Sequence, residues 1–185
     1  MRAVKRFFSQ LHRYLFWLLL MAFFWAWIFF MLTDTVKAKK VTVYIDAPEV
    51  RSAELEAALS GSLPEGIKLI KVHSFSYAAF NTLAANSADI YVMSADVLMD
   101  NIENLAPISS AAGECADGGY YFEGELYGLP VRQAAGACAA ASYIGYSGDG
   151  EYYICFNKDS VHITNGTGRG DGAAYAVAER MLALP

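Results

Sequence analysis

The sequence lacks the short motifs by which many nucleotide-dependent and hydrolytic enzymes are recognised. It contains no P-loop, no G-x-G-x-x-G and no G-x-S-x-G element. Its three histidines, His12, His73 and His162, lie far apart in the chain, so their spacing predicts neither a metal site nor a Ser-His-Asp arrangement. We therefore expect a protein that is not an enzyme and that carries no cofactor and no metal.

Cysteine is scarce. The chain has three, Cys115, Cys138 and Cys155, and none forms a C-x-x-C pair, which argues against zinc and thioredoxin-type chemistry. One disulfide with one thiol left over is one interpretation for an oxidising compartment. The favoured interpretation is that all three are small apolar residues in strand or Ala-rich contexts.

Basic residues are also few beyond the N-terminus. Four of the 14 Lys and Arg residues precede Thr33, where there is no acid, so the rest of the chain holds 10 basic against 19 acidic residues. Beyond residue 32 the lysines cluster only at residues 37–40. Because phosphate contacts need clustered Lys and Arg, we do not expect nucleic acid as a partner.

The chain does contain a long apolar run at residues 14–32, YLFWLLLMAFFWAWIFFML, with no charge, Gly or Pro. A helix of this length reaches roughly 28 Å, close to the thickness of a bilayer core. The cations before it predict a cytoplasmic N-terminus. A cleaved signal peptide is the main alternative, but the run is longer and bulkier than such peptides need, and residues 33–38 form a poor cleavage site.

The predicted organisation therefore has four parts. Residues 1–13 form a basic cytoplasmic N-terminus, 14–32 a transmembrane signal-anchor helix, 33–40 a juxtamembrane spacer, and 41–185 an extracytoplasmic domain. The predicted location is the cell membrane, crossed once. About 150 residues outside are enough for one domain with its own core.

The first half of this domain alternates between strand and helix patterns. Strands are predicted at 41–45, 67–72 and 88–93, and helices at 52–63, 77–85 and 97–102. The order β-α-β-α-β-α calls for parallel strands with right-handed crossovers.

The second half changes character. Two short strands about a tight turn are predicted at 120–122 and 126–131, and a further strand at 151–156. The Ala-rich segment 134–141 is either a strand or a packed segment. Asp171 is expected to cap a final helix over 172–184.

Three stretches resemble the bacterial extracellular solute-binding proteins of ABC importers, in particular the sugar-type family. They are ADIYVMSAD at 88–96 followed by LAPI at 105–108, YFEGELYGLPV at 121–131, and YICFNKD at 153–159. The third departs from the family pattern at Cys155 and Phe156, and again just after it at Ser160 and Val161. All three occur in the family's order.

The resemblance implies a periplasmic-binding-protein-like α/β lobe, with a mostly parallel sheet flanked by helices, behind one transmembrane helix. Members of that family have two lobes and are about twice as long as residues 41–185, so this chain resembles a single lobe. The implied function is binding of a small solute, in particular a sugar, beside an ABC importer permease.

The binding site is expected beyond the carboxyl ends of the strands, where open α/β sheets bind ligands. The strand ends and the hairpin supply the candidates. Tyr77 would stack on a sugar, and Asp96 and Arg132 would bond hydroxyl groups. Plain structural roles compete, because Asp96 would also suit a helix cap and Tyr77 would also pack. The candidate ligand-binding residues are Asp46, Tyr77, Ser94, Asp96, Tyr127 and Arg132.

An alternative from a different class is a non-catalytic interaction or regulatory module. In that interpretation the lobe face that a second lobe would cover binds another protein or a second copy of this chain. A polar, concave face favours the solute, and a flat, apolar face favours the protein partner.

Overall fold

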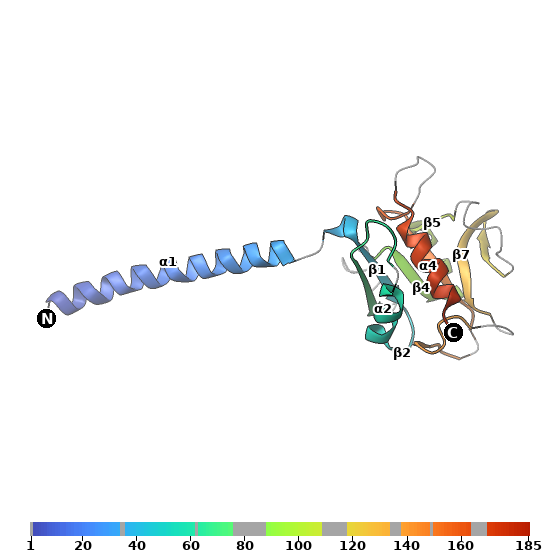
Figure 1. The fold of residues 1–185 in the computed structure, drawn as a ribbon, viewed down its shortest axis with the longest axis horizontal. Helices are drawn as coiled ribbons and strands as arrows, with labels where there is room; N and C mark the ends of the chain where they lie inside the picture. The colour runs from blue at the N-terminus through green and yellow to red at the C-terminus, as the bar shows by residue number, and fades with distance from the viewer. Residues whose placement is uncertain are drawn as a thin grey trace. The chain divides into compact units, whose positions relative to one another are not determined.

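The computed structural model describes residues 2–33, 36–61, 63–75, 88–108, 118–133, 138–148, 150–163 and 170–185. The chain divides into two compact units, Met1–Val36 and Lys37–Pro185 (Figure 1). The second unit begins before residue 41, because the predicted spacer ends in a 3-10 turn, η1 (Lys37–Lys39), that leads directly into the first strand. Each unit is described separately below.

The first unit consists of one helix, α1 (Arg2–Thr33), which extends the predicted helical run toward the N-terminus. Side chains are described for residues 14–29 of this helix, and they are exposed apart from the half-buried Ile28. Across the residues that the structure describes, none of the helices is both long and apolar enough to cross a membrane.

The second unit is built on one mixed sheet, which has seven strands in the part of the chain that the structure describes. Strand β5 (Leu105–Ala106) pairs with β9 (Tyr152–Asn157) outside the main path, and β2 (Glu49–Val50) pairs with β8 (Ile144–Gly145) in a separate ribbon. The strand order along the main path is β3 (Leu69–Ser74), β1 (Lys40–Ile45), β4 (Ile90–Ser94), β9 (Tyr152–Asn157), β7 (Glu125–Arg132) and β6 (Tyr120–Phe122).

Most of the long strands run in one direction. β1 is parallel to both β3 and β4, as the β-α-β pattern predicted. β9 is antiparallel to its two neighbours β4 and β7, so β7 runs in the same direction as β4. The carboxyl ends of β1, β3, β4 and β7 therefore lie at one edge of the sheet, together with the amino end of β9.

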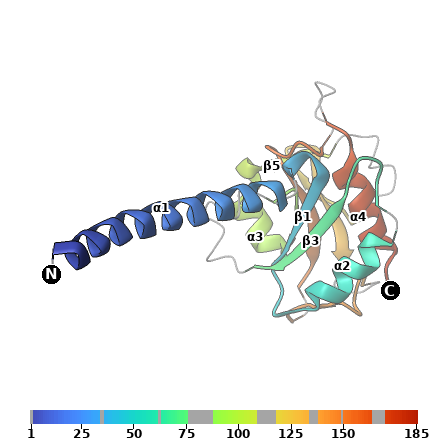
Figure 2. The same cartoon turned by 60° about the vertical axis from the view of Figure 1, so that its left-hand side comes forward.

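Helices lie on both faces of the sheet. Leu55 and Leu59 of α2 (Ser52–Ser60) and Val177 and Met181 of α4 (Ala173–Ala183) join the larger core cluster, with Val43 of β1. Leu98 of α3 (Ala95–Asp100) packs in the smaller cluster on the opposite face. Figure 2 shows α3 on one side of β1, with α2 and α4 on the other. The predicted α/β class, a largely parallel sheet flanked by helices, is confirmed.

Most predicted elements are present with shifted ends. α2 ends at Ser60 rather than 63, β3 begins at Leu69 rather than 67, and α3 begins at Ala95 rather than 97, before a 3-10 turn, η4 (Ile102–Asn104). The predicted helix 77–85 lies outside the described residues, as do residues 134–137 of the Ala-rich segment. The short strands β2, β5 and β8 were not predicted, because two residues carry too little pattern.

The outer edge of the sheet at β3 is closed by a side chain. Val72 directs its backbone N–H away from β1, and Oε1 of Glu56 on α2 accepts it at 2.9 Å. The other carboxylate oxygen lies 3.4 Å from Nζ of Lys71. One glutamate thus occupies an amide that an edge strand would otherwise present to solvent.

Cys138 and Cys155 are both free thiols, so they do not form a disulfide with each other. Cys155 is fully buried in β9, as a small apolar residue would be. Cys115 lies outside the described residues.

Candidate functional site

The carboxyl edge of the sheet brings residues from five strands together. Ser94, the last residue of β4, and Arg132, the last residue of β7, both pair with Tyr152 at the start of β9, one on each side. On β1, Ile45 pairs with Ser74 of β3, and the backbone N–H of Asp46 donates to Val92 of β4. The register therefore places the predicted strand ends side by side.

An open pocket of about 550 Å³ lies at this edge and is called the carboxyl-edge pocket below. Its volume falls within the range of small-molecule sites. The lining combines one carboxylate, three hydroxyl groups and two aromatic rings, one of which carries a hydroxyl. The lining residues are Asp46, Ala47, Pro48, Ser74, Phe75, Ser147 and Tyr152.

Arg132 stands directly beside this pocket. Its Nη1 lies 3.5 Å from the carbonyl oxygen of Ser147, and its guanidinium carbon lies 5.9 Å from the centre of the Tyr146 ring. Tyr146 packs on Tyr152 with ring centres 4.9 Å apart, and its hydroxyl donates to the Ala139 carbonyl. The Ser147 loop is held in turn by its backbone N–H, which donates to the hydroxyl of Tyr152 at 3.3 Å. A cation thus lies at the rim of the pocket, beside two tyrosine rings in tilted contact.

Three of the six predicted site residues come together here. Asp46 lines the carboxyl-edge pocket, and Ser94 and Arg132 flank its Tyr152. Tyr77 lies outside the described residues.

The other two predicted residues lie elsewhere. Asp96 is an exposed residue of the first turn of α3, does not line the pocket, and is not the helix cap, because Ser94 occupies the N-cap position. Tyr127 lies near the amino end of β7, since Leu129 already pairs with Ile154 in the middle of β9. Its hydroxyl is 3.5 Å from Oε2 of Glu125, away from the carboxyl edge.

Sequence reasoning missed Tyr152 and Ser147. Both belong to the segment that leads into β9, whose predicted strand carried no statement of direction. Because β9 runs against its neighbours, its beginning, rather than its end, reaches the carboxyl edge. The one available signal was the position of Tyr152 at the start of a strongly apolar strand.

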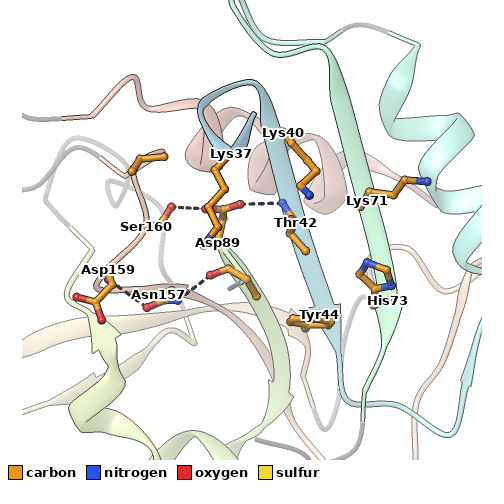
Figure 3. A pocket seen from close by; sticks show the side chains of 12 residues that line it. Lys37, Lys40, Thr42, Tyr44, Lys71, His73, Asp89, Asn157, Asp159 and Ser160 are labelled. Carbon is orange, nitrogen blue, oxygen red and sulfur yellow. Dashed lines mark hydrogen bonds between the residues drawn. The ribbon is translucent and has the colours of Figure 1, made fainter. Parts of the chain in front are cut away.

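A second pocket, of about 210 Å³, lies along β1 and β3, beside η1, the residues before β4 and the end of β9, and is called the amino-edge pocket below (Figure 3). Lysines, a histidine and two carboxylates surround it. The lining residues are Lys37, Lys40, Thr42, Tyr44, Lys71, His73, Ala88, Asp89, Asn157, Asp159, Ser160 and Val161.

The polar groups of the amino-edge pocket bond largely to one another. Asp89 accepts the backbone N–H of Thr42 at 2.8 Å and the hydroxyl of Ser160 at 2.6 Å, as the dashed lines of Figure 3 show. Burial raises the pKa of this carboxyl, and the two hydrogen bonds offset that only in part. Asn157 donates to the Ala88 carbonyl at 2.7 Å, and Lys71 is paired with Glu56. The contacts of Asp89 and Asn157 hold β1, β4 and β9 together, and that of Lys71 joins β3 to α2, so these contacts have a structural role.

Close to this pocket His162 and Asp171 form an acid–imidazole pair, with Nδ1 3.0 Å from the carboxylate. The other ring nitrogen, Nε2, faces the backbone carbonyl oxygens of Lys37 and Lys40. It therefore does not face the hydroxyl or thiol that a nucleophilic mechanism would require. Within the described ranges, no group of His, Cys, Asp and Glu side chains could hold a metal ion.

No protein-family model and no curated protein matches this chain. Among solved structures, it is similar to thiaminase I from Bacillus thiaminolyticus, with 20% identity and a TM-score of 0.34. The match covers 50% of this chain and 28% of that chain. A likeness this low carries no argument about fold or function, and it gives the expectation of a non-catalytic protein no support. The fold and the carboxyl-edge pocket define a mixed α/β domain with a polar site at its strand ends.

Proposed function

We propose that residues 37–185 bind a small polar solute, of the carbohydrate class, in the carboxyl-edge pocket. The observation that carries the proposal is the meeting of Asp46, Ser74, Ser147 and Tyr152 around one open pocket, with Arg132 at its rim. Carboxylate, guanidinium and hydroxyl groups bond sugar hydroxyls, and an aromatic ring packs against a sugar face. The position at the strand ends is where open α/β sheets bind ligands.

The carboxyl-edge pocket is open to solvent, and we expect this openness to keep the affinity for a solute low. A lone lobe leaves much of a bound solute in water, so only part of its polar surface is paired. We propose that a second surface completes the site, in the manner of a two-lobed binder or of an ABC importer permease that receives the solute. The chain on its own would bind weakly.

The apolar run 14–32 would hold the domain at a membrane beside such a permease, with the N-terminus in the cytoplasm. Its charge-free composition and the basic residues before it support this placement. Exposed rings along α1, among them Trp17, Phe23 and Trp25, support a role in contact with lipid or another apolar surface. Anchoring would raise the local concentration of a weak binder near its partner.

Thermal shift of the purified full-length chain against mono- and oligosaccharides at millimolar concentration tests the solute proposal. A ligand at 100 times its Kd should stabilise the chain by about 2.7 kcal/mol. The shift should disappear in Asp46→Asn and in Arg132→Gln. It should persist in Tyr127→Phe, a matched control at the other end of β7. If no sugar in the panel shifts the unfolding temperature, the carbohydrate assignment is wrong.

A protein-interaction module is the second candidate. It is favoured by the β6–β7 hairpin, where Tyr121 is 57% exposed and Phe122 is 37% exposed beside the acidic residues Glu123 and Glu125. Concentration-dependent dimers that are lost in Tyr121→Ser, together with no response to any solute, would favour this candidate over the first.

A further inference from the structure

His162 connects two parts of the second unit that lie far apart in the sequence. It follows β9 in the turn that leads toward α4, and it is 1% exposed. Its backbone carbonyl accepts the N–H of Ala174 in the first turn of α4, and its own N–H donates to Ser160. Its side chain bridges between Asp171, just before α4, and η1, where the chain enters the domain.

Among the residues that the structure describes, the imidazole ring makes four polar contacts, all with acceptors. Nδ1 lies 3.1 and 3.0 Å from the two carboxylate oxygens of Asp171. Nε2 lies 2.9 Å from the carbonyl oxygen of Lys37 and 3.1 Å from that of Lys40. A carbonyl oxygen and an ionised carboxylate cannot donate a hydrogen bond. Both ring nitrogens must therefore carry a proton for both sets of contacts to form.

A neutral imidazole ring cannot donate a hydrogen bond from both Nδ1 and Nε2. If Nδ1 keeps its proton, the lone pair of Nε2 points at two carbonyl oxygens. If Nε2 keeps its proton, the lone pair of Nδ1 points at a carboxylate. Either tautomer replaces one attractive contact of the buried ring by a repulsive one, so the bridge holds only with the cationic ring.

The surrounding charges favour that cation. Asp171 acts on the ring from just before α4, and Asp89 from just before β4, while the ammonium group of Lys37 on η1 acts on Asp89. Burial alone lowers the pKa of His162. The hydrogen bonds to Lys37 and Asp171 and the charges of Asp89 and Asp171 outweigh burial and raise it above its ordinary value.

We propose that His162 is a proton-controlled latch: the imidazolium fixes the Lys37–Lys40 turn to the start of α4, and loss of the proton releases that turn. Because the latched state binds the proton more tightly than the open state, latching is complete below the ordinary histidine range and is lost as the pH rises through the elevated value. Lys37 and Lys40 also line the amino-edge pocket, so the same proton controls one wall of that pocket.

Nuclear magnetic resonance of the histidine rings in the full-length chain tests the proton directly. The chain has three histidines, so His12→Gln and His73→Gln assign the signals by difference. In the folded chain His162 should titrate at higher pH than the same histidine in the urea-unfolded chain, and both ring nitrogens should be protonated at pH 6. A neutral His162 ring at pH 6 would overturn the proposal.

Amide hydrogen exchange tests the release. The N–H of Lys68 donates to the Lys39 carbonyl at 2.8 Å and reports on the docked turn, while the N–H of Asp46, bonded to Val92, serves as the control at the other edge. After correction for intrinsic exchange rates, protection at Lys68 should fall tenfold for each unit by which the pKa of His162 is raised by latching. The midpoint of this fall should coincide with the midpoint of the His162 titration measured by nuclear magnetic resonance. Protection at Asp46 should not follow it.

Two variants separate the latch from general stability. His162→Gln, which cannot donate from both ends, should leave Lys68 poorly protected at every pH. Asp171→Asn keeps the size and a carbonyl acceptor at an exposed position but removes the charge, so the midpoint should move to lower pH while the latch still closes. If Asp171→Asn folds and its midpoint is unchanged, or if protection at Lys68 is independent of pH in the unaltered chain, the latch does not exist.

Discussion

The two ends of the same sheet hold pockets of opposite character. The amino-edge pocket is about 210 Å³, and its carboxylate, amide and hydroxyl groups bond to neighbouring strands. The carboxyl-edge pocket is about 550 Å³ and is lined by side chains of the loops that follow β1 and β3 and precede β9. At the first end Asp89 and Asn157 bond neighbouring strands and turns, whereas at the second end polar side chains line the larger pocket. A count of polar residues would not distinguish these two ends, and the volumes and linings of their pockets do.

The largest expected effect of a substitution lies at the amino edge. Asp89→Ala removes the acceptor of the Thr42 N–H and of the Ser160 hydroxyl, both of which are buried. Two unpaired buried donors should lower the free energy of unfolding by about 3 kcal/mol. Urea unfolding of the full-length chain measures this value. Asp89→Asn, which keeps one acceptor, should lose less than about 1 kcal/mol. Equal losses in the two variants would mean that these bonds do not hold the strands together.

The next effect is a dependence of stability on pH that originates at the same edge. Because the pKa of His162 is raised in the folded chain, its stabilisation is complete below the ordinary histidine range and disappears as the pH rises through the folded value. The slope in that window cannot exceed about 1.4 kcal/mol per pH unit for one proton. Thermal unfolding between pH 5 and 9 should show this fall, and His162→Gln should flatten it relative to His73→Gln.

At the carboxyl edge, we expect the substitution of Arg132 to change the free energy of unfolding little but to weaken solute binding. Arg132→Gln loses a cation–π contact at 5.9 Å and a long bond to the Ser147 carbonyl. Such contacts at a partly exposed position contribute about 0.5–1 kcal/mol. The same variant should abolish the response to a bound sugar. A loss of several kcal/mol would instead assign Arg132 to the framework and would weaken the contrast between the edges.

The smallest effect is expected for Ser147→Ala. The exposed Ser147 hydroxyl lines the carboxyl-edge pocket, whereas the bonds that hold this loop use the backbone N–H and carbonyl. Removing the hydroxyl should change the free energy of unfolding by less than about 0.5 kcal/mol. If a solute uses this hydroxyl, its affinity should fall by roughly tenfold, which titration calorimetry of the two proteins would detect.

Local pattern was sufficient to predict the strands β1, β3 and β4 and the helices α2 and α3, with ends shifted by a few residues. The alternation of buried Val41, Val43 and Ile45 with residues of the other face identifies β1, and the almost continuous apolar run of β4 indicates a strand covered on both faces. Asp46 followed from these two strands, because the carboxyl end of a parallel strand has a known position in the sheet.

The positions of several site residues depend on contacts between segments that lie far apart in the sequence, so the sequence did not predict them. The direction of β9 depends on its register with β4 and β7, which no local pattern encodes, so Tyr152 could not be assigned to the carboxyl edge. His162 was set aside because the three histidines lie far apart in the chain, yet its Nε2 contacts lie 122 and 125 residues away. Asp96 was chosen because it follows a strand, but the helix that begins at Ala95 carries it away from the pocket.

The glutamate at the outer edge of β3 limits how copies of this domain could associate. A strand at the edge of a sheet can accept a strand from another molecule and so begin open-ended aggregation. Glu56 occupies the outward amide of Val72 and places negative charge along that edge. A second copy would have to displace this carboxylate before its own backbone could pair there. Glu56→Ala should therefore shorten the lag time of aggregation in concentrated solution more than it changes the unfolding temperature, and light scattering would record the difference.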